Sequence, residues 1–173
     1  MSKLPTVLAL SAVALVIAGC GGSSKSSSTS TPAGVPSTPS TAPSAPASGG
    51  VKISSSTIAG LGPVLVNAQG HTLYIFARDK AKKVTCVSSC EVVWPPATLP
   101  SGRKPVAAGP VKQSLLGSDP NPASGQVITY AGWPLYTYVT DTAAGQASGQ
   151  ALNLNGGLWY VISPTGKVIT KKR

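Results

Sequence analysis

The sequence predicts an all-β domain, a compact antiparallel sandwich or partly closed barrel built from two hairpin repeats, behind a disordered tether. From residue 51 onward the apolar runs are short, β-branched or aromatic, and no long run repeats with the 3.6-residue period of a helix. Gly, Pro and Asn separate these runs. Residues 21–50, in contrast, are almost entirely Gly, Ser, Thr, Pro and Ala, a composition that cannot bury a core.

The first 19 residues are predicted to be a lipoprotein signal peptide. Lys3 is followed by an apolar run of about 14 residues that ends at Ile17, and the small residues Ala18 and Gly19 come directly before Cys20. A membrane-spanning helix needs about 20 apolar residues, so this run is too short to remain as a span. The pattern predicts cleavage before Cys20 and lipidation of its thiol. An ordinary secretory signal with a coincidental Cys20 is the alternative.

Residues 20–50 are predicted to be the lipidated cysteine and a disordered tether. Prolines favour extended polyproline conformations, whereas the Gly/Ser-rich start behaves as flexible coil. A coil of this length has a mean reach of roughly 30 Å. The tether therefore holds the domain, residues 51–173, away from the membrane.

Within the domain, turn signals separate the predicted strands. They are Ala68-Gln69-Gly70, Ala131-Gly132 and residues 163–166. The stretch between residues 95 and 125 is rich in Gly and Pro and is expected to be a long connection. The predicted strands are 64–67, 72–77, 126–130, 135–139, 158–162 and 167–170.

The domain contains an internal repeat. Residues 70–79 and 132–141 align without a gap and share Gly, Leu, Tyr and Asp, and aliphatic pairs precede both, so the repeat cores are 64–79 and 126–141. A duplicated hairpin can bury two apolar faces together. Because side chains at i and i+2 share a face of a strand, each copy should form an aromatic ladder, with its leucine on the other face. The ladders are Tyr74 with Phe76 and Tyr136 with Tyr138, and the leucines are Leu73 and Leu135.

These motifs resemble a family of bacterial lipoproteins, the "secreted repeat of unknown function", marked by Tyr-x-[Phe/Trp/Tyr]-x-x-Asp. The resemblance implies export, lipidation and a repeat fold, but no established reaction. It extends to motifs around Tyr130 and Trp159 and to two cysteines followed by Trp-Pro-Pro, a pair that the second copy lacks. The matching residues are Tyr74, Phe76, Asp79, Cys86, Cys90, Trp94, Tyr136, Tyr138 and Asp141.

Cys86 and Cys90 would face an oxidising compartment, so a disulfide is expected. The loop that it would close is small, and the chain-entropy estimate for its stabilisation is only about 2 kcal/mol. The bond is therefore expected to be a local staple before Trp94. An exposed dithiol that cycles between oxidised and reduced forms remains the alternative, although the spacing is not Cys-x-x-Cys.

Asp79 and Asp141 follow equivalent strands, where a short carboxylate typically accepts backbone N–H bonds and fixes a turn. A glycosidase would instead need two carboxylates roughly 5 to 10 Å apart. The motif tyrosines are interpreted as core or as a binding platform. His71 is the only histidine, so neither a catalytic triad nor a His-based metal site is expected. Phosphate-binding loops and dinucleotide fingerprints are missing from the sequence, so no cofactor is expected. Candidates for an aromatic surface that stacks on a ligand are Trp94, Trp133 and Trp159.

The chain is basic, with 14 Lys and Arg against four Asp and Glu and a net charge of +10. This excess favours an anionic cell-wall polymer, acidic lipid or an envelope protein as partner, with a merely solvated surface as the alternative. Nucleic acid is not expected, because the protein is exported and its basic clusters lack interleaved aromatic residues.

The predicted protein is therefore a lipid-anchored membrane protein on the extracytoplasmic face, with a non-catalytic binding or structural role. Sorting to an outer membrane would follow if the host has two membranes. One alternative is a redox or electron-transfer accessory that uses Cys86 and Cys90. The other is an enzyme acting on the cell wall or on glycans.

Overall fold

The structure is a computed structural model that describes residues 49–79 and 83–173. The predicted signal peptide, Cys20 and nearly all of the predicted tether lie outside the described residues. Across the described ranges the chain forms ten strands, one α-helix of five residues and one 3₁₀ turn. The all-β prediction is confirmed.

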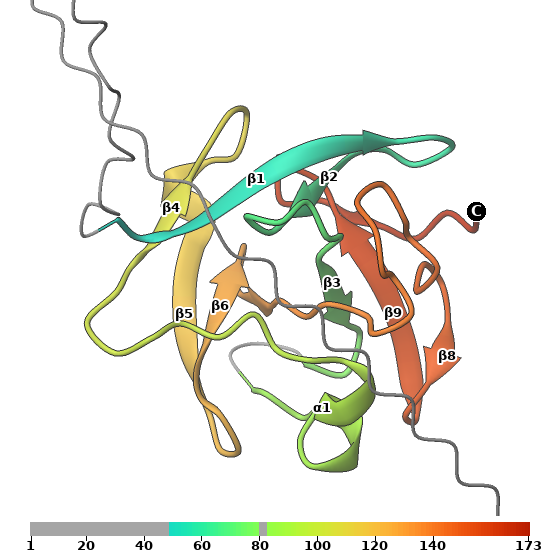
Figure 1. The fold of residues 1–173 in the computed structure, drawn as a ribbon. Coiled ribbons are helices and arrows are strands. Elements are labelled where there is room, and N and C mark those ends of the chain that lie inside the picture. The colour runs from blue at the N-terminus through green and yellow to red at the C-terminus, as the bar shows by residue number, and fades with distance from the viewer. Residues whose placement is uncertain (1–48, 80–82) are drawn as a thin grey trace, which may run out of the picture. The chain divides into compact units, whose positions relative to one another are not determined.

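The strands form three sheets, none of which closes on itself (Figure 1). The first has the order β2-β1-β4, in which β1 pairs antiparallel with β2 and parallel with β4. The second has the order β10-β9-β3, with β8 also paired to β9. The third is the meander β5-β6-β7. The strands are β1 (Val51–Ile58), β2 (Gly62–Val66), β3 (Tyr74–Phe76), β4 (Pro105–Ala107), β5 (Leu116–Asn121), β6 (Gly125–Tyr130), β7 (Trp133–Pro134), β8 (Asn153–Leu154), β9 (Gly157–Ile162) and β10 (Val168–Ile169).

Two short helical segments interrupt the connection between β3 and β5. The α-helix α1 (Ser89–Val93) follows the first repeat core, and the 3₁₀ turn η1 (Gln113–Leu115) precedes β5. Figure 1 shows α1 beyond the end of β3, apart from the β1–β2 pair. The long connection expected between residues 95 and 125 contains β4, η1 and the whole of β5.

The apolar side chains form two core clusters, and β3 contributes to both. Tyr74 and Phe76 pack in one cluster, whereas Leu73 and Ile75 pack in the other. The second repeat divides in the same way, with Tyr136 in the first cluster and its neighbouring leucine in the second. The prediction that the aromatic ladders and the leucines occupy opposite faces is confirmed.

The predicted strand 135–139 is wrong as a continuous strand. This segment lies against residues 95–97, where Ala97 donates to Leu135 O at 2.8 Å and Thr137 donates to Pro95 O at 2.9 Å. Consecutive prolines in residues 95–97 have no N–H to donate, so only isolated bridges form. The sequence analysis also missed β1 and β5, because β1 contains three serines and β5 contains Gly, Asp, Pro and Asn.

The two repeats differ by one residue in their hairpin turns. Gly70 has a φ of 85° in the longer first turn, whereas Ala131 and Gly132 have φ values of 51° and 80° in a two-residue turn. As a result, Leu73 donates to Leu65 O, but Leu135 donates to Ile128 O, each at 2.9 Å. The gapless alignment therefore holds after the turn, whereas the strands before the turn match with a shift of one residue.

Candidate functional site

The two copies of the motif meet at their first tyrosines. Tyr74 N–H donates to Tyr136 O at 2.8 Å, and Tyr136 N–H donates to Tyr74 O at 2.9 Å. This reciprocal pair is a single antiparallel bridge between the repeats. An approximate two-fold axis relating the copies therefore passes between these two residues.

Each tyrosine hydroxyl donates to the aspartate of the other copy. Tyr74 Oη lies 2.5 Å from Asp141 Oδ2, and Tyr136 Oη lies 2.5 Å from Asp79 Oδ2. All four side chains are buried, with exposed fractions of 3% or less. The motif thus joins the two repeats through a crossed pair of hydrogen bonds.

The second oxygen of each carboxylate fixes the loop that follows it. Asp79 Oδ1 accepts the backbone N–H of Thr85 at 2.7 Å and its hydroxyl, and Asp141 Oδ1 accepts the N–H of Ser148 at 2.9 Å. The prediction that these aspartates accept backbone N–H bonds after a strand is confirmed for both copies. What the sequence did not indicate is that the partner hydroxyl comes from the other repeat.

The environment of the motif keeps both tyrosines neutral. Burial raises the pKa of Tyr74 and Tyr136 far above the ordinary value, and the hydrogen bond to the partner carboxylate raises each further. A neutral hydroxyl that donates to a carboxylate serves as a fixed donor and not as a base. The motif is therefore arranged to hold the repeats together.

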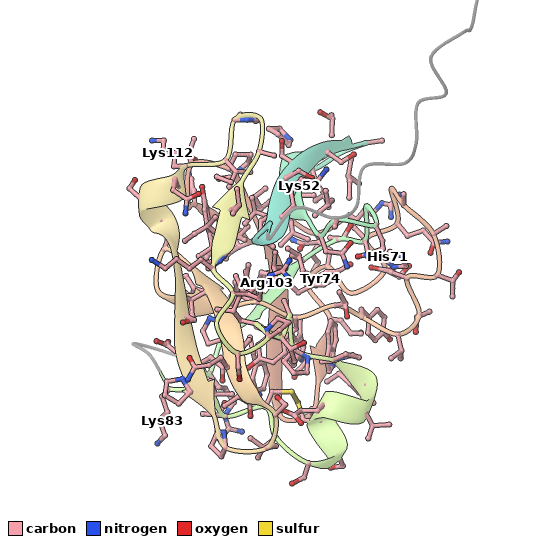
Figure 2. All side chains as sticks on the ribbon, turned by 60° about the vertical axis from the view of Figure 1, so that its left-hand side comes forward. Lys52, His71, Tyr74, Lys83, Arg103 and Lys112 are labelled. Carbon is pink, nitrogen blue, oxygen red and sulfur yellow. A yellow bond between two sulfur atoms is a disulfide. The ribbon has the colours of Figure 1, made fainter. Side chains whose placement is uncertain are left out.

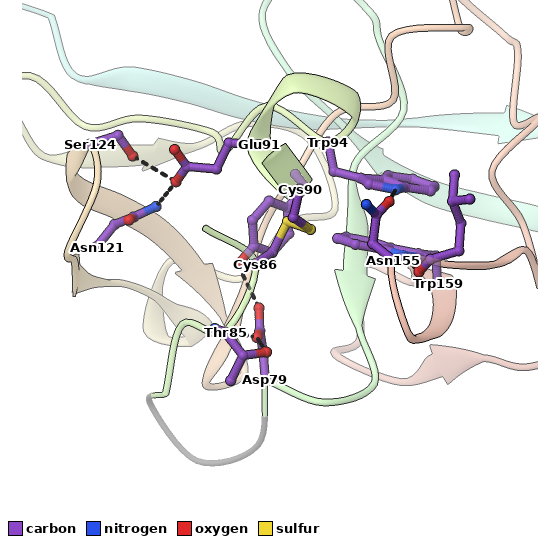
Figure 3. The surroundings of a disulfide bond; sticks show 12 residues. Asp79, Thr85, Cys86, Cys90, Glu91, Trp94, Asn121, Ser124, Asn155 and Trp159 are labelled. Atoms are coloured by element: carbon purple, nitrogen blue, oxygen red, sulfur yellow. Dashed lines mark hydrogen bonds between the residues drawn. A yellow bond between two sulfur atoms is a disulfide. The ribbon is translucent and has the colours of Figure 1, made fainter. Parts of the chain in front are cut away.

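Four aromatic rings stack across the approximate axis. Trp94 and Trp159 lie at the centre with ring centroids 3.9 Å apart, Phe76 stacks on Trp159 at 4.3 Å, and Tyr138 stacks on Trp94 at 4.2 Å. The order Phe76, Trp159, Trp94, Tyr138 alternates between the repeats, and Figure 3 shows the two indoles face to face. The stack joins the repeats through apolar contact.

The candidate aromatic surface of Trp94, Trp133 and Trp159 is wrong for two of its members. Trp94 and Trp159 are each 0% exposed, because the stack encloses them. Trp133 is half-buried against the second core cluster. Tyr138, by contrast, is the one partly exposed ring of the stack.

The indole N–H groups find partners that the sequence analysis did not single out. Trp94 Nε1 donates to Asn155 Oδ1 at 3.2 Å (Figure 3). Trp159 Nε1 donates to Leu154 O at 3.0 Å. Asn155 has a φ of 53° and precedes Gly156 in the two-residue turn between β8 and β9. The Asn-Gly dipeptide was the available signal for this turn.

Cys86 and Cys90 form the expected disulfide, with an S–S distance of 1.99 Å. Both cysteines belong to the first core cluster, and the exposed fractions of Cys86 and Cys90 are 0% and 8% (Figure 3). In the second repeat Gly149 follows Ser148 as Cys86 follows Thr85. A Cβ at Gly149 would lie 2.7 Å from Trp94, so the packing there excludes a side chain.

His71 belongs to no metal cluster within the described ranges, because no group of three or more metal-binding side chains occurs in them. His71, from the first repeat, places its Nδ1 2.9 Å from the backbone oxygen of Asp141 at the end of the second repeat core. No helix among the described residues is long and apolar enough to cross a membrane.

Acidic and basic side chains differ in how far they are exposed to solvent. Asp79, Asp119 and Asp141 are buried, and half-buried Glu91 accepts hydrogen bonds from Asn121 and Ser124. Figure 2 shows Lys83 and Lys112 at the periphery. The described cationic residues are all exposed: Lys52, Arg78, Lys83, Arg103, Lys104, Lys112, Lys167, Lys171, Lys172 and Arg173.

The fold and the crossed Tyr–Asp hydrogen bonds define the class of protein. It is a duplicated β-repeat domain in which the motif of each copy bonds to the motif of the other. The model of the family described as a secreted repeat of unknown function matches this chain twice, at residues 55–98 and 121–163. The chain belongs to this family, which places the domain outside the cytoplasm. No curated protein and no solved structure matches the chain.

Proposed function

We propose that this chain is a lipid-anchored protein of the extracytoplasmic membrane face whose domain binds an anionic polymer of the cell envelope, without catalysis. The proposal rests on the difference in burial between the acidic and the basic side chains. The described Lys and Arg residues are exposed, whereas the aspartates are buried and Glu91 is half-buried and hydrogen-bonded. The electrostatic potential at the surface is therefore positive, which favours association with polyanions.

The motif residues support a non-catalytic role. The carboxylates and hydroxyls of the two copies are engaged with one another in the core, so these groups are already committed as structural donors and acceptors. A glycosidase would need such carboxylates open to substrate and water. Redox exchange at the cysteines is also disfavoured, because an attacking thiolate needs access to a sulfur and this disulfide is buried.

Binding to poly(glycerol phosphate), compared with neutral dextran, tests the proposed partner. We expect the Cys20→Ser protein to bind only the phosphate polymer, with a dissociation constant that rises steeply with salt. Replacing Lys171, Lys172 and Arg173 with Gln should weaken binding by about tenfold or more, because each surface cation near an anionic partner contributes about 1 kcal/mol. Replacing exposed Thr165 with Ala is the control. Equal binding to both polymers, or no dependence on salt, would contradict the proposal.

Palmitate labelling of cells tests the anchor separately. The wild-type protein should carry label and sediment with membranes, whereas Cys20→Ala should lose the label, because the thiol is the acceptor of the lipid. Two or more acyl chains hold a protein stably on a bilayer, whereas one allows exchange. Unchanged labelling of Cys20→Ala would exclude lipidation at this cysteine and leave polymer binding to be judged on its own.

A further inference from the structure

Two adjoining hollows form one groove on the domain. Their volumes are about 270 and 400 Å³, and Asn67, Gln69 and Thr137 line both of them. Residues 67–71 form one wall, and residues 137–142 contribute the other wall of the larger hollow. The groove is thus continuous from β1 to the loop after the second motif, and its hollows are similar in size to small-ligand sites.

Apolar residues make up much of the lining of the smaller hollow, and the hydrogen-bonding side chains of the groove, apart from His71 and Asp141, are uncharged amides and hydroxyls. Amides come from Asn67 and Gln69, and hydroxyls come from Thr98, Thr137 and Thr142. None of the described Lys or Arg side chains lines either hollow, although the surrounding surface is cationic. The Asp141 carboxylate is already bonded to Tyr74 and Ser148. This lining is therefore suited to a neutral polar ligand.

Tyr138 supplies an apolar platform in the larger hollow. Trp94 covers one face of its ring, with centroids 4.2 Å apart and an interplanar angle of 20°. Tyr138 is partly exposed and lines the larger hollow, so it is the member of the stack that a ligand in the groove can reach. A flat apolar ligand face placed there would continue the aromatic stack by one member.

His71 adds a hydrogen-bond acceptor of defined orientation. Its Nδ1 lies 2.9 Å from the carbonyl oxygen of Asp141, and a carbonyl can only accept, so Nδ1 carries the proton. In the neutral ring this leaves Nε2 as an acceptor. The groove therefore offers amide and hydroxyl donors, one imidazole acceptor and one aromatic face.

We infer that this groove binds a neutral oligosaccharide. A pyranose ring has an apolar C–H face that can lie on Tyr138, and its hydroxyls both donate and accept, as the lining amides, hydroxyls and imidazole require. A phosphorylated or acidic ligand would find no Lys or Arg side chain in this lining. The inference does not depend on the proposed polyanion contact, because that contact uses Lys and Arg side chains outside the groove.

The test uses the mature chain with Cys20→Ser and neutral chitotetraose as the probe, by calorimetry and by backbone amide NMR. We expect shift changes confined to residues 67–71, 96–98 and 137–142, and a dissociation constant that changes less than about twofold between low and high salt, because no ionic contact is made. Polyanion binding would respond to salt, so failure of either proposal can be distinguished.

Matched variants locate the contact. Gln69→Ala removes an exposed amide and should weaken binding by about three- to tenfold, whereas Gln126→Ala removes an exposed amide outside the groove and should leave it unchanged. Tyr138→Ala should weaken binding by about tenfold or more, with thermal unfolding used to verify that the variant is folded. Absence of binding at millimolar sugar, shifts elsewhere, or equal affinity of Gln69→Ala and Gln126→Ala would overturn the inference. Binding of a peptide of residues 31–47 to the groove in preference to the sugar would also overturn the inference.

Discussion

At the residue scale, the family motif is a device for joining two repeats. The hydroxyl of Tyr74 reaches Asp141 and that of Tyr136 reaches Asp79, so neither copy satisfies its own carboxylate through its tyrosine. A buried carboxylate without donors would be costly. Tyr and Asp are therefore required together in both copies.

Tyr136→Phe should lower the free energy of unfolding by about 1 to 3 kcal/mol, because it removes a hydrogen-bond donor from the buried Asp79 carboxylate. Urea unfolding at neutral pH measures the change. The control is Tyr160→Phe, whose hydroxyl makes no hydrogen bond to the described residues and whose loss should cost less than about 0.5 kcal/mol. Equal stability of the two variants would show that the crossed bond contributes nothing.

Stability should fall as the pH rises above about 10. Burial and the carboxylate bond raise the pKa of Tyr74 and Tyr136 in the folded state, so these groups keep their protons there while unfolded tyrosines ionise near pH 10. The unfolded state then binds fewer protons, and the free energy of unfolding decreases with pH. Urea midpoints between about pH 8 and 11 should decline less steeply in Tyr136→Phe, and parallel curves would contradict this assignment.

At the scale of elements, strand pairing exchanges partners between repeats. β3 of the first repeat pairs with β9 of the second, and Tyr136 of the second repeat bridges Pro96 of the first. The short helix α1 and the disulfide lie in the loop that brings Trp94 into the stack. In the second repeat, Gly149 donates its N–H to Tyr74 Oη at 3.3 Å and lies close to Trp94, with no cysteine at that place.

The double variant Cys86→Ala/Cys90→Ala should remain folded and lose about 2 kcal/mol of stability, since the disulfide closes a loop of only a few residues. Urea unfolding and near-UV circular dichroism, which reports the Trp stack, check both statements. In the native wild-type protein the buried bond should resist dithiothreitol and yield only in denaturant. Rapid reduction of the disulfide in the native protein would instead support the alternative that Cys86 and Cys90 have a redox function.

At the scale of the whole molecule, the two repeats are interlocked through strand pairing, hydrogen bonds and ring stacking. Figure 1 shows β3 beside β9, although the repeats that contribute them are far apart in the sequence. The crossed hydrogen bonds and the four-ring stack also join one repeat to the other. Neither repeat has these partners when it is alone.

Fragments 49–110 and 111–173 should each be unfolded in isolation, because each would expose half of the shared stack and lack a strand partner. Circular dichroism of the separate fragments should show coil, and mixing them should restore β-structure. Full-length protein measured at the same concentration is the reference. An independently folded fragment with a cooperative transition would refute the interlocked arrangement.

Several features could be predicted from the sequence because they depend on local order along the chain. The alternation of side chains in residues 73–76 predicted which of them lie on each face of β3, and the turn residues predicted where the hairpins bend. Asp79 and Asp141 directly follow strands, a position from which a carboxylate can accept backbone N–H bonds of the next loop. β5 could not be predicted, because residues that are usual in loops are held there by pairing with β6.

The sequence by itself determined the all-β class, the duplication, the family and the disulfide, since these are matters of composition, spacing and redox compartment. Only the tertiary structure decided that Trp94 and Trp159 are core residues and that Tyr138 alone of the stack reaches the surface. It also decided which tyrosine bonds which aspartate. The physical reason is that burial and cross-repeat pairing depend on contacts between residues distant in the chain, which neither periodicity nor turn chemistry encodes.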